Sequence, residues 1–512
     1  MSLGTTAAVA LHGMEGHVIQ VQAQLAASVP GFTLVGLPDA ALAESRDRVR
    51  AAVLSTGIEW PHRKITVNLS PASLRKSGSA FDLAVAVAVL AGHRVLRASG
   101  LEEVVHVAEL GLDGRLQPVR GVLPAVAAAV RAGYRDVVVA AGDAQEAALV
   151  PGARVHGAVD LGDVVRRHGG ALRTERRSTP VPPVRTGGGR SPAGDLVDVV
   201  GQSEARLALE VAAAGAHHLL MLGPPGAGKT MLAARLPGIL PDLTEPEAVE
   251  VTAVHSVAGT FDPGGGLLRR PPFEDPHHTA SPAAIVGGGT GLARPGAVSR
   301  AHRGVLFLDE APEFAPRVLQ TLRQPIEAGE LVLHRSGGAT RYPARFQLVL
   351  AANPCPCGMA TTGAGADCSC TPMARRRYLA RLSGPLLDRV DLQVHLASLS
   401  RAERALGASG ESSADVAARV HGARGRARER LAGTPWRTNA ELPGPWLREH
   451  LRAERAVLAG VERQLDAGEL SMRGADRVLR IACTLADLDG RGVPDADDVD
   501  AARLFRTGDR RG

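Results

Sequence analysis

The sequence predicts an α/β protein of two to four domains. The chain has 512 residues, enough for that number at roughly 100–200 residues per domain. In the N-terminal half, short β-like runs alternate with helical patterns, and the second half has apolar strand candidates at 218–222, 304–308 and 346–353. Apolar residues make up 45% of the chain and charged residues 22%, which is globular usage and excludes a fully disordered or collagen-like protein.

The N-terminal part has the elements of a separate domain, expected over residues 1–172. Its β-like runs are 18–25, 64–69 and 136–141. Its helical patterns are 39–56, 82–91 and 123–132. Their order fits an α/β or an α+β domain and by itself indicates no function. Residues 173–194 are rich in Pro, Gly, Ser and Arg without apolar periodicity, so we expect an exposed linker there.

Arginine carries nearly all of the positive charge. Of 59 basic residues only Lys64, Lys76 and Lys229 are lysines, and the net charge is +6 with a pI of about 9.4. A GC-rich genome explains this bias most simply, because Ala and Gly are also abundant, and a retained lysine then marks chemistry that arginine cannot copy. The charge suits a polyanion partner without establishing one, and 3% aromatic residues disfavour binding by base stacking.

The sequence predicts a cytoplasmic protein with no membrane partner. The longest apolar run, 83–92, is half of the roughly twenty residues that a spanning helix needs. The N-terminus lacks the basic, apolar and small-residue sections of a signal peptide. Five cysteines in a chain of this length are too few for a disulfide framework.

A phosphate-binding loop follows the first strand candidate of the second half. The residues of this loop are Gly223, Pro224, Pro225, Gly226, Ala227, Gly228, Lys229 and Thr230, which match G-x-x-x-x-G-K-[ST] at every position. Its glycines allow backbone N–H groups to turn toward phosphate oxygens. Lys229 supplies an ammonium between the β- and γ-phosphates of ATP, and Thr230 can ligate Mg²⁺.

The other two strand candidates end in polar side chains that suit hydrolysis. Asp309 and Glu310 follow the run 304–308 about 80 residues after the loop. An acid there can hold Mg²⁺, and the next acid can polarise the attacking water. Asn353 ends the third candidate and can orient water near the γ-phosphate; the alternative is a turn asparagine.

Four cysteines form two close pairs, and these are candidate zinc ligands. Cys355 and Cys357 are separated by ten residues from Cys368 and Cys370. Four thiolates at such a range can bind a tetrahedral Zn²⁺, although one residue within each pair is tighter than the usual two to four. A reduced thiol cluster and a redox disulfide remain alternatives, and Cys483, on a helical apolar pattern, is expected in a core.

Motifs along nearly the whole chain resemble the magnesium-chelatase-like branch of the AAA+ ATPases, and within it the ComM/YifB family. They include NLSPASLRKSGSAFDLAVA (68–86), PFEDPHHTASPAAIVGGG (272–289), AANPCPCG (351–358) and SMRGADRVLRIACTLADLDG (471–490). The resemblance implies an AAA+ P-loop core over 195–398 and a helical C-terminal lid over 399–512. The linker has no counterpart in it.

The resemblance also assigns residues to the ATPase. Arg389 looks like the arginine finger presented to a neighbouring subunit's ATP, Arg473 like the sensor-2 arginine of the lid, and Asn353 like sensor 1. Fixed cations of this kind stabilise charge on the transferred phosphoryl group. For Arg389 the alternative is a salt bridge with Asp388 or Asp391, and for Arg473 a surface charge.

A hairpin is predicted between the Walker B acids and sensor 1. Residues 330–346 read as two β-runs around Gly337 and Gly338. In the branch that this chain resembles, such a hairpin projects into the pore of a ring. Arg335 and Arg341, which we expect to flank its tip, would then contact DNA phosphates, with His277 and His278 as a second candidate contact. An ordinary exposed hairpin and plain loop histidines are the alternatives.

The N-terminal domain resembles the proteolytic domain of Lon, over 76–90 and 115–140. Lon uses a serine activated by a lysine. Aligning the motifs puts Ala80 at the serine and Ala125 at the lysine, and a register that substitutes Ser79 still lacks the lysine. We therefore predict no protease activity, and expect Lys76 to be a surface or partner contact.

The resemblance implies a ring, hexameric by expectation, that hydrolyses ATP with Mg²⁺ and moves on single-stranded or branched DNA. ComM resemblance implies branch migration, a helicase activity, during natural transformation. The alternatives are a metal-insertion motor like that of magnesium chelatase, and a regulatory or chaperone ATPase.

Overall fold

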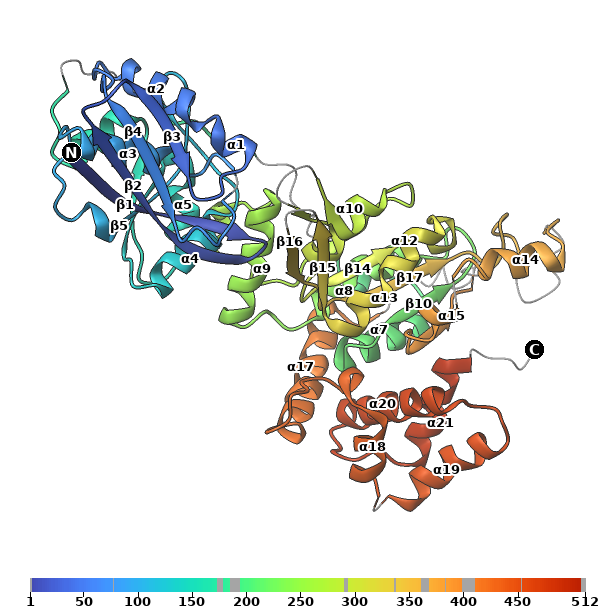
Figure 1. Cartoon of the computed structure of the whole chain (residues 1–512). Coiled ribbons are helices and arrows are strands. Elements are labelled where there is room, and N and C mark those ends of the chain that lie inside the picture. Colours follow the sequence, from blue (N-terminus) through green and yellow to red (C-terminus); the bar gives the residue numbers. More distant parts are fainter. Residues whose placement is uncertain are drawn as a thin grey trace.

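The computed structural model describes most of the chain, which folds into three consecutive parts (Figure 1). Described are residues 2–76, 78–172, 178–184, 194–289, 293–335, 338–360, 368–382, 384–397, 410–452 and 454–507, without the side chains of residues 40, 41, 335, 338 and 507. Most of the predicted linker and the predicted boundary at 398/399 fall outside this description. Within it, no helix combines the length and the apolar character that crossing a membrane requires.

The first part is built on a seven-stranded mixed sheet in the order β3-β4-β2-β1-β5-β8-β9. Its strands are β1 (Ser2–His12), β2 (Glu15–Ala26), β3 (Gly31–Val35), β4 (Lys64–Ser70), β5 (Val104–Val107), β8 (Asp136–Ala140) and β9 (Arg154–Ala158). β2 is antiparallel to β1 and to β4, and the other neighbours run parallel. A small pair, β6 (Glu109–Leu110) and β7 (Leu116–Gln117), lies beside it. The runs at 18–25, 64–69 and 136–141 are thereby confirmed as strands.

Helices cover both faces of this sheet. They are α1 (Ala40–Ala43), α2 (Ser45–Ser55), α3 (Asp82–Gly92), α4 (Val122–Arg131), α5 (Ala144–Ala147) and α6 (Leu161–Arg167). Strand β8 shows the two layers, because Val138 packs with α3 while its neighbours Val137 and Val139 pack with α4. Every residue of α3 is buried, as expected for a helix that is apolar on all sides.

The second part is a five-stranded sheet in which all strands are parallel. Its order is β11-β14-β17-β10-β18, with β10 (Leu219–Leu222), β11 (Phe273–Glu274), β14 (Val305–Leu308), β17 (Gln347–Ala352) and β18 (Leu392–His395). The predicted strands at 218–222, 304–308 and 346–353 are confirmed as β10, β14 and β17. Since all five strands are parallel, their carboxyl ends share one edge.

Helices and small β-pairs surround this sheet. The helices are α7 (Ser203–Gly215), α8 (Lys229–Ile239), α9 (Glu245–Ala258), α10 (Pro282–Val286), α11 (Ala297–Arg300), α12 (Pro316–Thr321), α13 (Arg323–Ala328), α14 (Pro372–Leu379) and α15 (Gly384–Leu387). The pairs are β12 (Gly287–Gly288) with β13 (Arg294–Pro295), and the predicted hairpin β15 (Glu330–Arg335) with β16 (Gly338–Pro343).

The third part is helical and shares a core with the second. Its helices are α17 (Ser413–Arg430), α18 (Gly444–His450), α19 (Arg455–Asp466), α20 (Met472–Leu488) and α21 (Ala496–Thr507). One apolar cluster joins Leu209 of α7, Val420 of α17 and Ile481 of α20. Cys483 is buried in this cluster, as predicted. A buried polar chain reinforces the junction, since His217 contacts Asp391 before β18 and Thr484 in α20.

Candidate nucleotide site

The phosphate-binding loop connects β10 to α8 in a conformation that requires its glycines. Gly226 and Gly228 have φ of +77° and +93°, in the left-handed region that favours glycine. Gly223 is needed for a different reason, because a Cβ there would lie 2.7 Å from the carbonyl oxygen of Leu396. The loop therefore leads directly into the N-terminus of α8, where backbone N–H groups can bind phosphate.

Lys229 lies at the centre of this loop with its ammonium group fully engaged. Its Nζ donates to the carbonyl oxygens of Gly223 (2.7 Å) and Pro224 (2.9 Å) and to Asn353 Oδ1 (3.0 Å). Burial lowers the pKa of Lys229, and the carboxylates of Asp309 and Glu310 oppose that shift. The lysine thus connects the loop to the residue that follows β17.

The metal-binding candidates meet across two strands. Thr230 Oγ1 donates to Asp309 Oδ2 at 2.6 Å, so the two groups predicted to share Mg²⁺ lie within one hydrogen bond. Hydroxyl and carboxylate oxygens are the donors that this hard cation prefers. Glu310 follows with φ of +50°, a rare conformation for a non-glycine residue that is often found at functional sites. Lys229, Thr230, Asp309, Glu310 and Asn353 are therefore brought together at one edge of the sheet.

A histidine that we expected to contact DNA is a neighbour of this group. His278, expected as a DNA contact, lies beside Glu310, with Nδ1 3.3 Å from Oε2. Its ring is 4.1 Å, centroid to centroid, from that of His277, which bonds to Thr279. The reason is topological: β11 is parallel to β14, so the loop after β11 returns to the edge that carries Glu310. No spacing in the sequence signals that contact.

Arg389 and Arg473 lie together, away from their own phosphate-binding loop. Arg389 precedes the amino end of β18, whereas the loop follows the carboxyl end of the parallel strand β10. The strand alone separates these ends by about 10 Å. Arg473, 76% exposed in the first turn of α20, is 3.9 Å from Asp388. Burial and the positive charges of Arg323 and Arg473 lower the pKa of Arg389.

The contacts of Arg389 differ from the predicted alternative. Its guanidinium pairs with Glu327 of α13 and donates to the carbonyl of Pro385, not to Asp388 or Asp391. Its Nε is buried without a hydrogen-bond partner among the described residues. Glu327 and the carbonyl of Pro385 therefore hold this guanidinium against its own chain.

The hairpin forms as predicted but its arginines differ in position. Arg335 pairs in register with Gly338 at the tip, and its side chain lies outside the description. Arg341 does not flank the tip: it pairs with Val332, and its guanidinium binds Glu330 at 2.7 Å. Residue 341 also borders the N-terminal domain, since a Cβ on Gly13 would lie 2.8 Å from its carbonyl oxygen.

The positions aligned with the Lon dyad face one apolar cluster. Ala125 belongs to this cluster and Ala80 packs against it, so neither position offers a nucleophile or a base. Ser79 donates to Glu109 instead. The expectation for Lys76 was wrong: it is fully buried and donates to the carbonyl of Pro71, and burial lowers its pKa.

The four paired cysteines converge on one point. Their sulfur atoms all lie within 4.8 Å of one another, and the distances from Cys355 to Cys357 and Cys368 are 3.3 and 3.6 Å. Ligands on a tetrahedral zinc with bonds of about 2.3 Å are separated by about 3.8 Å. Burial opposes ionisation of Cys355, but hydrogen bonds from Cys357 and the amide of Ala360 outweigh it and lower its pKa to about 6. The donor set fits zinc.

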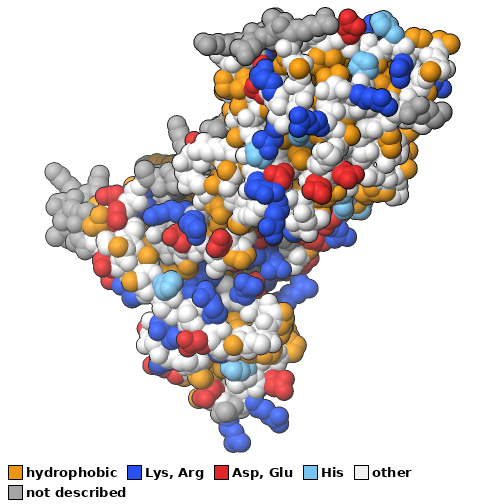
Figure 2. Space-filling view, turned by 90° about the vertical axis from the view of Figure 1, so that its left-hand side faces the viewer, with side chains coloured by type: hydrophobic (Ala, Val, Ile, Leu, Met, Phe, Trp, Pro, Cys, Tyr) orange, Lys and Arg blue, Asp and Glu red, His pale blue; other side chains and the backbone are white. Residues whose placement is uncertain are grey.

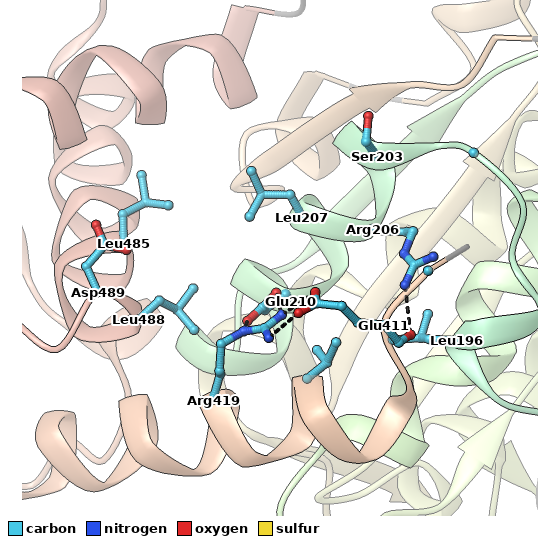
Figure 3. Close-up of a pocket in the computed structure, with 13 residues that line it drawn as sticks. Leu196, Ser203, Arg206, Leu207, Glu210, Glu411, Arg419, Leu485, Leu488 and Asp489 are labelled. Carbon is cyan, nitrogen blue, oxygen red and sulfur yellow. Dashed lines mark hydrogen bonds and ion pairs between the residues drawn. The ribbon is translucent and has the colours of Figure 1, made fainter. Parts of the chain in front are cut away.

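A separate cavity of about 580 Å³ lies between α7, α17 and α20 (Figure 3). Arg419 closes one side with two hydrogen bonds to Glu210 and two to Glu411. Arg206 is also engaged, by the carbonyls of Val199 and Glu411. None of the described lining residues belongs to the phosphate-binding loop. The chemistry of the loop therefore makes the loop, and not this cavity, the candidate nucleotide site.

Comparison with family models agrees with the geometry. Residues 195–404 match the model described as magnesium chelatase, subunit ChlI, and residues 410–506 its C-terminal model. Residues 21–143 match a further model, described as subunit ChlI of Mg-chelatase. The chain is therefore an AAA+ ATPase of the magnesium-chelatase-like class, with a parallel α/β core and a helical C-terminal part.

Comparison with individual proteins narrows this class. The chain is 52% identical over its full length to an uncharacterized protein of Mycobacterium tuberculosis, all of which is covered. It is 41% identical to the competence protein ComM of Haemophilus influenzae, over 96% of this chain and 94% of that one. It is 40% identical to the uncharacterized protein YifB of Escherichia coli, over 100% and 98%. The chain belongs to the ComM/YifB family.

Proposed function

We propose that this chain is a ring-forming ATPase that couples ATP hydrolysis to movement on DNA, with branch migration during natural transformation as its role. In this proposal residues 223–230 bind the phosphates of ATP, while Thr230 and Asp309 hold Mg²⁺. Glu310 polarises the attacking water, and Asn353 orients it. Bound Mg²⁺ would neutralise charge on the phosphates during transfer.

One observation supports a ring of subunits. The two proposed halves of the catalytic site lie at opposite edges of one sheet. Lys229, Asp309 and Asn353 lie at the carboxyl edge, and Arg389 precedes the amino end of β18. One subunit cannot supply both halves to one nucleotide, whereas a neighbour packed head to tail can. Heterologous contacts of this kind close into a ring when the rotation between neighbours divides a full turn evenly. We propose a hexamer.

Arg473 belongs with Arg389 in this proposal. Because both lie beside Asp388, one neighbouring ATP would meet both guanidinium groups. Arg473 is thereby assigned to the same shared site instead of to the subunit's own nucleotide. A trans arginine is worth about 10³–10⁵ in rate. Mixing Arg389→Ala protein with Lys229→Ala protein should restore part of the activity, and absence of any restoration would contradict a shared site.

The proposed DNA contacts are Arg335 and Arg341 in the hairpin, with His277 and His278. Contacts to phosphate without base recognition fit a motor that moves on any sequence. Lys and Arg side chains also gather across the middle of one face, between the N-terminal domain and the lid (Figure 2). The choice of DNA as the partner is supported by a relative that is named as a competence protein and aligns over nearly its full length.

A metal-insertion motor is the second candidate, because all three matching models are described by a magnesium-chelatase subunit. The two candidates differ in a simple assay. A DNA motor hydrolyses ATP faster with DNA and binds it more weakly as salt rises. A metal-insertion motor does not respond to DNA.

The decisive experiment is unwinding of branched DNA with and without ATP. Wild-type protein should separate the arms only with ATP and Mg²⁺, and Glu310→Gln protein should bind the DNA without separating it. If DNA changes neither the ATPase rate nor the oligomeric state, the motor proposal fails.

The proposal includes three further points. The N-terminal domain is a Lon-like scaffold without protease activity, since Ala80 and Ala125 replace the dyad. The protein works in the cytoplasm. The paired cysteines bind a structural Zn²⁺. Casein cleavage that requires ATP and is lost in Ser79→Ala protein would contradict the first point.

A further inference from the structure

The four cysteines join two chain segments that both reach the ATP site. Cys355 and Cys357 belong to the turn that follows Asn353, and Cys368 and Cys370 precede α14. Cys355 is fully buried, whereas Cys357 is exposed. The cysteine cluster therefore lies at the surface, and the turn that carries its first pair leads inward to the sensor residue Asn353.

The first segment is pressed against the phosphate-binding loop. A Cβ on Gly358 would lie 2.6 Å from two atoms of the Pro225 ring and 4.0 Å from Cγ of Asn353. Gly358 also has φ of +78°, so no other residue fits there without strain. The turn with the first cysteine pair thus touches both the loop and the residue that holds Lys229.

The second segment folds back onto the same site from outside. Tyr378 of α14 is 4% exposed; burial and the nearby carboxylates of Glu313 and Glu310 raise its pKa to about 12, while a contact with the backbone of Asn353 opposes that rise. Three residues further on, Arg381 binds Glu313 at 3.0 Å. The first segment therefore borders the phosphate-binding loop and Asn353, and the second borders Asn353 and the acids after β14.

The chemistry of the cluster favours a metal over free thiols. Zinc bound by four thiolates carries a net charge of −2, and soft thiolates select it. Arg375, Arg376 and Arg377 follow Cys370 within one and a half turns of α14 and supply positive charge on that side. Nε of Arg375 is buried without a hydrogen-bond partner among the residues described.

We propose that Cys355, Cys357, Cys368 and Cys370 bind one Zn²⁺ that holds Asn353 against the phosphate-binding loop of the same subunit. The cysteines are positioning residues, because they touch the sensor turn and not the nucleotide. Loss of the metal leaves the loop able to bind ATP but lets Asn353 move. A misplacement of about 1 Å at a reacting centre costs about 100-fold in rate.

The first test compares two cysteine variants purified without chelators. Cys368→Ser removes one ligand, and Cys483→Ala, in α20, is the matched control. Wild type and the control should carry about one zinc per chain, and Cys368→Ser less than about 0.2. Basal kcat should fall about 100-fold in Cys368→Ser protein, while the Kd of a fluorescent ATP analogue stays within about three-fold.

Wild-type protein provides the test that does not depend on folding of a variant. Removing zinc with a chelator should lower kcat, and adding Zn²⁺ back should restore it. Co²⁺ in place of zinc should give the visible absorption of tetrahedral thiolate coordination. Less than half an equivalent of zinc in wild type overturns the metal site, and equal loss of ATP binding and kcat overturns the positioning role.

The inference rests on the role proposed for Asn353 in ATP hydrolysis. The mixing test separates it from the proposed ring. Because the metal acts within its own subunit, Cys368→Ser protein should stay inactive when mixed with Lys229→Ala protein, unlike Arg389→Ala protein. Restoration in that mixture overturns the inference. If DNA did not stimulate the ATPase of wild-type protein, the motor proposal would fail, but the basal kcat, zinc content and ATP affinity would still test this inference.

Discussion

Asp143 should make the junction between the N-terminal domain and the ATPase core sensitive to pH. This carboxyl is 3% exposed and accepts one hydrogen bond, from the amide of Val119 at 2.9 Å. Burial raises its pKa from 3.8 to about 7, and the nearby carboxylate of Glu146 adds to the rise. Glu146 itself accepts from Ser256 of α9, so the acids lie where the two domains meet.

The sign and size of the effect follow from this shift. The folded state binds the proton more tightly than the unfolded state, so stability is full below the unfolded pKa of 3.8 and falls until the pH exceeds about 7. At about 1.36 kcal/mol per unit, the whole shift is worth about 4 kcal/mol, of which roughly 2.5 kcal/mol is lost between pH 5 and pH 8. For a domain of this size that is a Tm change of about 5–10 °C.

The assay is thermal unfolding at pH 5 and pH 8 of wild type, Asp143→Asn and the control Asp47→Asn, whose acid is 70% exposed. An asparagine keeps an acceptor for Val119 and offers its amide to Glu146, without a buried charge. The Tm of Asp143→Asn minus that of wild type should therefore be about 5–10 °C larger at pH 8 than at pH 5. For the control, the same difference should not change with pH. Parallel profiles for Asp143→Asn and wild type would refute the reasoning.

Three further substitutions test the catalytic site and the lid. Glu310→Gln should bind ATP with near-normal affinity and lower kcat by about 10²–10⁴, as measured in single-turnover assays; normal turnover would remove Glu310 from catalysis. His278→Ala should lower kcat about 10-fold with ATP KM unchanged, because it touches Glu310 and not the nucleotide; a changed KM alone would contradict this. Asp487→Ala should destabilise the lid by about 3–5 kcal/mol in urea titrations, because Arg430, 10% exposed, loses both of its hydrogen bonds to this carboxylate; a loss under about 1 kcal/mol would count against it.

The sequence predicted those parts of the fold whose signal is local. The strands β10, β14 and β17 are short apolar runs that end in motifs, so both their bounds and their polar ends could be read directly. That Lys229, Asp309 and Asn353 meet then follows from parallel pairing, since the carboxyl ends of such strands share an edge. The helix α3 was equally clear, because 83–91 is continuously apolar.

What could not be predicted depends on contacts between distant segments. The strand β1 was missed because its small residues have weak β-propensity. They are there for packing: a Cβ on Gly4 would lie 2.2 Å from the carbonyl of Ala88 in α3. Lys76 gave no sign of burial because it stands between Arg75 and Ser77 in a polar stretch. His278 meets Glu310 only through the order of β11 and β14.

The parallel register of β10 and β18 has a consequence for energy use in the cell. In the proposed ring, the finger and the phosphate-binding loop of one chain serve different neighbours, so a free subunit that holds ATP would have no partner to trigger its hydrolysis. Turnover per subunit should then rise with protein concentration and level off once assembly is complete. Dilution would then stop ATP hydrolysis, and ATP would be consumed only by assembled rings.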